Sequence, residues 1–136
     1  MDSLFFTEEH KMIQRMVSEF AKDEIIPVAR ELDKTGEFPK NIVKKMGSLG
    51  LMGINVPTEY GGSGLDMVSY AAAIIELAKA DASIAITMAA HTSLGTLPIL
   101  LYGSSSLKKK YLPKIASGET LSAFGLTEPQ AGSDAG

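Results

Sequence analysis

The sequence predicts an all-α fold that ends in a single strand. Apolar residues recur at helical spacings through most of residues 1–118, and residues that favour helix starts precede several of these stretches. By contrast, residues 120–128 alternate and are rich in β-compatible types. A lone strand leaves the hydrogen-bonding groups of both edges unpaired. We therefore expect a helical domain over residues 1–118, and the truncated start of a β domain over residues 119–136.

The first helix is expected to run from Thr7 to about Ile25. The Thr7 side chain can cap free backbone amides, and Glu8 and Glu9 lie at the positive end of the helix dipole. One buried stripe at helical spacing then comprises Met12, Ile13, Met16, Val17 and Phe20. Pro27 suits the start of a short second segment.

Another helix is expected to begin at Pro39, since proline is favoured in the first position of a helix. Its apolar face comprises Ile42, Val43, Met46 and Leu49. Gly47 and Gly50 lie where this helix should end. The glycines and Pro57 of residues 50–66 then predict a long loop.

Two helices with aspartate caps are expected after this loop. Asp66 precedes an apolar stripe, and Asp81 precedes a stretch that has no charged residue before Lys108. The uncharged stretch is long enough to span a bilayer, but its many Ser, Thr, His and Gly residues favour a helix buried on most sides of a core. Pro98 should kink or break this helix near Leu97.

The last expected helix begins near Ser104, whose side chain suits a cap. Its exposed side is basic, and Pro113 and Gly118 punctuate its end. The charge run 108–110 within it fits a solvated helix face, with a phosphate contact as the less favoured alternative.

Composition excludes several classes of function. Thirteen Lys and Arg residues against sixteen Asp and Glu residues give a net charge of -3, which argues against a nucleic-acid binder. No cysteine is present, so disulfides, thiol nucleophiles and cysteine-based metal sites are excluded. The first residues have neither the basic region nor the long apolar run of a targeting segment. We expect no membrane span, no metal, and a cytoplasmic, bacterial protein.

The two histidines do not form a ligand pair by spacing. His10 lies in the first turn of a charged helix and is expected to be solvated. His91, on the uncharged helix, fits a hydrogen-bonded core or pocket residue better than a catalyst. Neither a P-loop nor a dinucleotide-binding fingerprint occurs near the glycines at 61, 62 and 64.

The most suggestive stretch is FGLTEPQAGSDAG, residues 124–136. Thr127 would place a hydroxyl at the end of the strand, beside the edge of a ligand. Pro129 would stiffen the exit, and Gly132 would permit close approach of backbone. The Ser133 hydroxyl and amide would then be available to a phosphate or a polar ring edge. A glycine-rich turn of this kind also occurs as ordinary structure.

This stretch resembles the signature of the flavin-dependent acyl-CoA dehydrogenases. GLTEPQAGSDAG is similar to the family's flavin-side motif, VPTEYGGSGLD to its loop after the early helices, and KKKYLPKIASGE to its helix before the β domain. HTSLG followed by PI looks most like the short-chain, butyryl-CoA type. One departure is Gln130, where glycine is more usual, at a permissive position.

The resemblance implies a three-part enzyme that holds FAD and acyl-CoA between its parts, with this chain as the helical N-terminal domain plus the first strand of the middle domain. It implies flavin contacts from Phe124, Gly125, Leu126, Thr127, Gly132 and Ser133. It further implies that Ser133 contacts the acyl-CoA, and that Thr87, Ala90, His91 and Leu94 share the face lining the acyl-chain pocket. Ordinary helix core is an equal alternative for each of these four residues.

The implied reaction is oxidation of a short-chain acyl-CoA to trans-2-enoyl-CoA, with electrons passing through FAD to an electron-transferring flavoprotein. The catalytic base of the family is a glutamate of the C-terminal domain, so no catalytic residue is assigned here, and Glu128 does not take that role. The chain by itself is expected to be inactive, and the full-length protein to be a homotetramer. The alternative is a non-catalytic helical interaction module derived from the same domain.

Overall fold

The computed structural model describes residues 6–134. The expectation about a targeting segment rests partly on residues 1–5, which lie outside the described residues, as do the last two residues of the glycine-rich motif. The helical segments are α1 (Glu8–Phe20), η1 (Ala21–Ile25), α2 (Ile26–Thr35), α3 (Lys40–Ser48), η2 (Thr58–Tyr60), α4 (Met67–Ala80), α5 (Ala82–Ala89), η3 (Ala90–Thr96), α6 (Leu97–Tyr102) and α7 (Ser105–Ala116). No strand is formed among the described residues, which confirms the all-α class.

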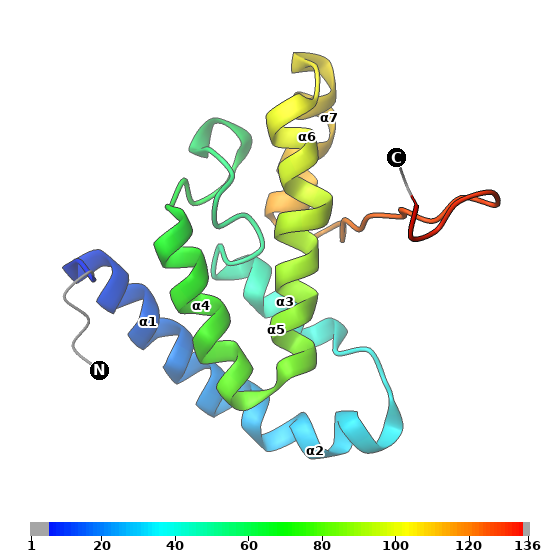
Figure 1. Ribbon diagram of the computed structural model, residues 1–136. Coiled ribbons are helices and arrows are strands. Elements are labelled where there is room, and N and C mark those ends of the chain that lie inside the picture. The colour runs from blue at the N-terminus through cyan, green and yellow to red at the C-terminus, as the bar shows by residue number, and fades with distance from the viewer. Residues whose placement is uncertain (1–5, 135–136) are drawn as a thin grey trace.

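The helices pack around one main core. Helices α1 and α4 lie side by side, and α4 and α5 form an antiparallel pair joined at Asp81 (Figure 1). The segments α5, η3 and α6 run on as one helix, and α7 returns beside α6 (Figure 1). The main core comprises Val17, Ala21, Ile25, Ile42, Val43, Met46, Leu51, Met52, Ile54, Ala73, Leu77, Ile84, Ala85 and Met88.

The expected helix caps are confirmed. The side chains of Thr7, Asp66, Asp81 and Ser104 accept hydrogen bonds from the backbone N–H groups of His10, Ser69, Ile84 and Leu107. Each cap satisfies one of the free donors at its helix start. These contacts are local, because donor and acceptor lie three residues apart in each case.

Pro98 was expected to kink or break its helix near Leu97, and the helix is not broken there. A π-helical stretch, η3, comes directly before it, and the backbone N–H of Leu97 bonds five residues back to the carbonyl of Thr92. A proline ring normally clashes with the carbonyl four residues earlier, and the wider π turn moves this carbonyl aside. The same arrangement, η1 followed by Pro27, carries α1 into α2 without a break. The helix expected to end at Ile25 therefore continues to Thr35.

The long loop predicted over residues 50–66 is confirmed, but several of its side chains are buried in the core. Its side chains Leu51, Met52, Ile54 and Val56 are each at most 2% exposed. A Cβ atom added to Gly53 would lie 2.7 Å from the Cβ of Ala116, so the loop backbone lies directly against α7. The loop therefore forms part of the core between α3 and α7.

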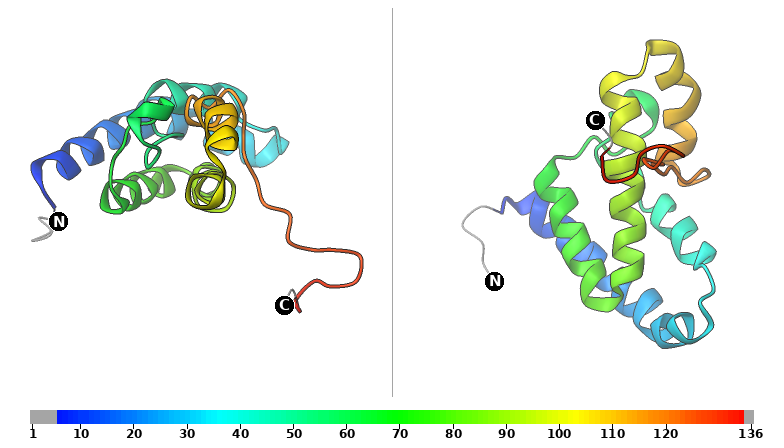
Figure 2. Two further views of the ribbon diagram at one scale, coloured as in Figure 1. Left: turned by 90° about the horizontal axis from the view of Figure 1, so that it is seen from above. Right: turned by 45° about the vertical axis from the view of Figure 1, so that its right-hand side comes forward.

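Residues 120–128 form no strand, although their sequence predicted one. They leave the helices as an extended arm (Figure 2). The one β-type pairing among the described residues of the arm joins Glu128 to Ala131 across a tight turn. A strand is defined by its pairing, and the described residues contain no second strand to pair with it. The sequence of this segment thus alternates as in a strand, but the described residues supply no second strand with which it could form a sheet.

The helix Ala82–Tyr102 passes the length and composition test for a membrane span, and 39% of its most apolar window is buried inside the protein. It was expected to be buried on most sides, and this fraction is lower. Its α5 part packs on α4, and its η3 part buries His91, Thr92 and Thr96.

Candidate functional site

The site is built from two parts, the outer face of the long helix and the arm that follows α7. Thr87 is partly exposed and Leu94 is 50% exposed, and both lie on the outer face together with partly exposed Ala90. The neighbouring Ile86 is 66% exposed. A helix that leaves so much apolar surface uncovered suits a wall that another part of a protein, or a ligand, covers.

His91 does not share that face, although it was grouped with Thr87, Ala90 and Leu94. Its side chain points into the core and is 1% exposed. Its Nε2 lies 3.1 Å from the carbonyl oxygen of Met52, and its Nδ1 lies 3.1 Å from the backbone nitrogen of Ser122. Burial lowers the pKa of His91 below its usual 6.5. The expectation of a hydrogen-bonded core histidine is confirmed.

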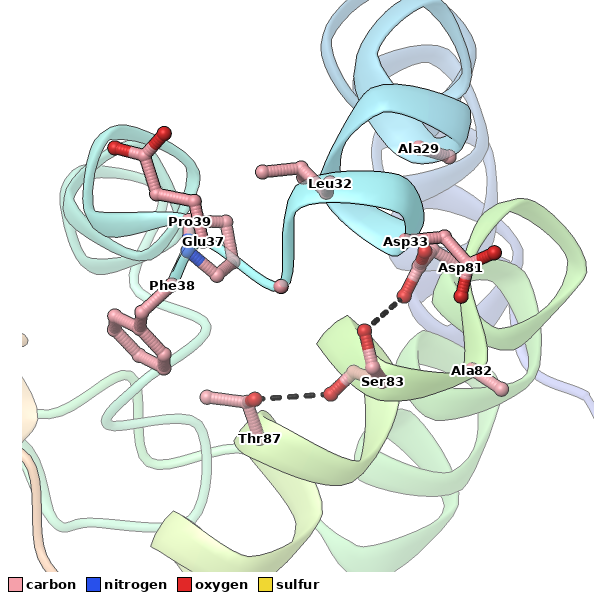
Figure 3. Close-up of a pocket in the computed structure, with 11 residues that line it drawn as sticks. Ala29, Leu32, Asp33, Glu37, Phe38, Pro39, Asp81, Ala82, Ser83 and Thr87 are labelled. Atoms are coloured by element: carbon pink, nitrogen blue, oxygen red, sulfur yellow. Dashed lines mark hydrogen bonds between the residues drawn. The ribbon is translucent and has the colours of Figure 1, made fainter.

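A cleft of about 720 Å³ opens at the start of the long helix, between the end of α2 and the turn before α3. Thr87 and Phe38 point toward one another from its opposite walls (Figure 3). Thr87 Oγ1 donates to the carbonyl of Ser83 at 2.9 Å, which holds its methyl group toward the cleft. Leu94 is not among the lining residues. Thr87 therefore lines the cleft, whereas Leu94, further along the same helix, does not.

The arm presents the residues expected at the flavin. Phe124 and Leu126 are 56% and 54% exposed, and Thr127 is also exposed. A Cβ added at Gly125 would meet no atom within 4 Å, and one at Gly132 would meet only Thr127 Cγ2, at 3.9 Å. The packing of the described residues therefore gives neither glycine a reason to lack a side chain.

A tight turn separates the two halves of the arm. The backbone N–H of Glu128 donates to the carbonyl of Ala131 at 2.9 Å, and that of Ala131 donates back at 3.2 Å. Gln130 occupies this turn without a positive φ, so the departure from glycine is accommodated, as expected. Gly132 and Ser133 follow the turn and are exposed.

The sequence-based expectation for His10 is wrong. Its side chain is buried, its Nδ1 accepts from the backbone N–H of Thr7 at 3.1 Å, and its Nε2 donates to Asp66 Oδ2 at 2.9 Å. The backbone N–H of Ser69 and the His10 ring lower the pKa of Asp66 to about 2. This pair joins the N-terminal ends of α1 and α4, and no local signal could have predicted a partner 56 residues away.

No group of three or more His, Asp or Glu residues that could hold a metal occurs within residues 6–134. The candidate ligand surface therefore consists of the exposed arm and the partly exposed outer face of the long helix.

The chain belongs to the acyl-CoA dehydrogenase family. The family described as "Acyl-CoA dehydrogenase, N-terminal domain" matches residues 7–119, which confirms the resemblance drawn from the motifs. The chain is 52% identical to an acyl-CoA dehydrogenase of Bacillus subtilis and 46% identical to a short-chain specific acyl-CoA dehydrogenase of Clostridium acetobutylicum. Each of these alignments covers 96% of this chain and 34% of the relative, so the chain spans about a third of their length.

Solved structures agree with this assignment. An acyl-CoA dehydrogenase from Bacillus anthracis complexed with FAD superposes with a TM-score of 0.90 at 45% identity, over 98% of this chain and 23% of that one. A chain from work on the electron transferring flavoprotein of Acidaminococcus fermentans superposes with a TM-score of 0.92, also at 45% identity, over 99% of this chain and 35% of that one.

Proposed function

We propose that this chain forms part of a flavin-dependent enzyme that oxidises a short-chain acyl-CoA to trans-2-enoyl-CoA. The observation that carries the proposal is the exposed glycine-bearing arm, in a chain 52% identical to an acyl-CoA dehydrogenase. FAD bound beside the arm would supply the acceptor for the hydride from the β-carbon, and a base would take the proton from the α-carbon. We assign no base to this chain, and expect it to come from a C-terminal domain of the full-length protein.

The residues of the arm fit a flavin. The described residues offer no hydrogen-bond partner to the backbone of residues 123–127, so the amides there are free to meet the nitrogen and oxygen atoms of a ring edge. Phe124 and Leu126 supply apolar contact, and the Thr127 hydroxyl supplies a further donor. Open space at Gly125 and Gly132 allows a planar ring to approach the backbone.

The acyl-CoA is assigned to two places. The hydroxyl and amide of Ser133 follow the turn and are exposed to a ligand beside the flavin. Thr87 and Leu94 would line the pocket for the acyl chain, with Ala90 between them on the outer helix face. A pocket that accepts a short chain must be apolar and incompletely filled, and the small side chain of Ala90 leaves such room.

Titration of FAD tests the cofactor proposal. Amino-acid side chains do not absorb visible light, so the visible circular dichroism of the flavin reports binding directly. Gly132→Val places a branched side chain where the ring approaches, and we expect FAD binding to weaken at least tenfold. Gln130→Ala in the same exposed turn is the matched control and should bind FAD like the wild type. Equal affinity in Gly132→Val and wild type would contradict the assigned contact.

Chain-length preference of the complete enzyme tests the pocket. Ala90→Leu should reduce kcat/KM for longer acyl-CoA substrates more than for shorter ones, because the added atoms fill the end of the pocket. Ile86→Leu, on the same exposed side, should leave the preference unchanged. An unshifted preference in Ala90→Leu would refute the assignment of this face.

We infer three further properties of the complete enzyme. An electron-transferring flavoprotein is the proposed electron acceptor, supported by the similarity to a chain from work on such a flavoprotein. Substrate-dependent reduction of a purified bacterial electron-transferring flavoprotein would test this. A homotetramer in the bacterial cytoplasm is proposed for the full-length protein, and sedimentation and cell fractionation measure both. A colourless oligomer without affinity for FAD would instead favour the non-catalytic interaction module.

A further inference from the structure

One residue of the arm is fastened to the helices. Among the described residues 121–134, Ser122 alone forms hydrogen bonds to a helix. Its backbone N–H donates to His91 Nδ1 at 3.1 Å, and its hydroxyl donates to the carbonyl of His91 at 3.0 Å. The same hydroxyl lies 3.1 Å from Thr96 Oγ1. The remaining residues of the arm extend away from the helical body (Figure 2).

The helix is shaped to receive this residue. A Cβ added at Gly95 would overlap Ser122 Oγ and would lie 2.5 Å from Ser122 C and Ser122 Cβ. Gly95 falls within the π-helical stretch η3, whose side chains Thr92 and Thr96 are buried although polar. The backbone of the arm therefore sits where only glycine leaves room for it.

The protonation of His91 is determined by its two partners. The Met52 carbonyl can only accept, so Nε2 carries the hydrogen, and Nδ1 is left as the acceptor for the Ser122 N–H. Burial lowers the pKa of His91, which keeps this neutral form at neutral pH. The His91 ring thus donates through Nε2 to Met52 of the buried loop and accepts through Nδ1 from Ser122 of the arm.

We propose that His91 is a positioning residue which, together with Ser122, forms a clasp that determines the direction in which the arm leaves the helical domain. This inference rests on the proposed function, because the flavin-contacting residues begin two positions after Ser122. In extended chain, Leu126 is roughly 13 Å from Ser122 along the backbone. A rotation of about 15° at Ser122 would therefore displace Leu126 by roughly 3 Å, enough to misplace a ring contact.

Two substitutions at His91 separate the two sides of the ring. The Asn side-chain oxygen falls near the position of Nδ1, so His91→Asn keeps an acceptor for Ser122. The Gln amide reaches the position of Nε2, so His91→Gln keeps the donor to Met52 and loses the acceptor for the Ser122 N–H. We expect His91→Asn to bind FAD within about threefold of wild type, and His91→Gln to bind it about tenfold more weakly, the equivalent of one net hydrogen bond. Wild-type affinity in His91→Gln would overturn the proposal.

A second pair of variants avoids the core. Ser122→Pro removes the donating N–H from a half-buried residue of the arm. Leu121→Pro stiffens the chain one residue earlier, at an exposed position with no hydrogen bond to the helices among the described residues. Only Ser122→Pro should weaken FAD binding, by about tenfold. Equal affinity in both variants would overturn the clasp even if His91→Gln failed to fold.

Amide hydrogen exchange of Ser122 in the FAD-free protein separates failure of the clasp from failure of the proposed function. Protection of this amide in wild type and in His91→Asn, with rapid exchange in His91→Gln, supports the clasp. If the wild type binds no FAD, the proposed function fails. The exchange pattern of the Ser122 amide then decides by itself whether the clasp exists. Equal exchange in all three proteins overturns the clasp.

Discussion

Gly47→Ala is expected to destabilise the protein, although alanine is the better helix former. Gly47 is buried in α3, where the helix passes the end of α7. An added Cβ would overlap the carbonyl oxygen of Ser117, and would lie 3.0 Å from Ser117 C and 3.3 Å from the Cα of Gly118. These neighbours are backbone atoms, which cannot rotate aside as a flexible side chain can.

Two opposing effects determine the magnitude. Helix propensity alone would stabilise the alanine variant by about 0.8–1 kcal/mol. Overpacking in a close-packed interior costs about 1–3 kcal/mol, and a backbone neighbour places this site at the upper end. We therefore expect a net loss of about 1–2 kcal/mol in the free energy of unfolding, or roughly 3–8 °C in Tm for a domain of this size.

Urea unfolding followed by far-ultraviolet circular dichroism measures this change. Ser48→Ala is the matched control, because Ser48 is the next residue, is exposed, and bonds only to the Lys44 carbonyl of its own helix. The control should change the free energy of unfolding by less than about 0.5 kcal/mol. A Gly47→Ala variant as stable as wild type, or more stable, would show that α3 and α7 do not approach as closely as these distances require.

Three further predictions concern stability. Met88→Ala should cost about 2–5 kcal/mol in chemical denaturation because the side chain is fully buried, whereas Ile86→Ala, on the exposed side of α5, should change stability by less than about 0.5 kcal/mol. The pKa of Asp66 is about 2 in the folded protein against an ordinary value of 3.8. The contribution of its carboxylate to folding stability is therefore present above pH 3.8 and is lost as the pH falls toward 2. Over that range, the Tm of Asp66→Asn should fall less than the Tm of the wild type. Burial lowers the pKa of His91 below 6.5, so protonation opposes folding as the pH drops below 6.5, and His91→Asn should lose less Tm there than wild type.

Local features were predictable because their partners are close in the chain. The caps at Thr7, Asp66, Asp81 and Ser104 each join residues three apart, and the helical stripes depend on a spacing that the sequence displays directly. The loop over residues 50–66 was visible in its glycines. Its burial was not, because a loop is buried only when other elements close around it.

The candidate site was predictable in part. The motif of residues 124–136 pointed to the family, and the family match over residues 7–119 confirms that assignment. The structure leaves residues 124–130 exposed, and their contacts with a ligand stay a prediction. The grouping of His91 with Thr87 and Leu94 failed, because similar helical spacing does not say which of the flanking positions turns inward. The π-helical stretch around His91, and with it the contact to Ser122, depends on packing between residues 31 positions apart.

The sequence by itself therefore determined the helices, their starting residues, the long loop and the family of this protein, because periodicity, capping and motifs are properties of neighbouring residues. Only the tertiary structure decided that His10 pairs with Asp66, that Pro98 continues its helix and that the arm forms no strand. The first depends on a partner 56 residues away, the second on the π-helical stretch before Pro98, and the third on the lack of a second strand among the described residues. Such contacts are long-range, and their energy appears only when distant segments pack together.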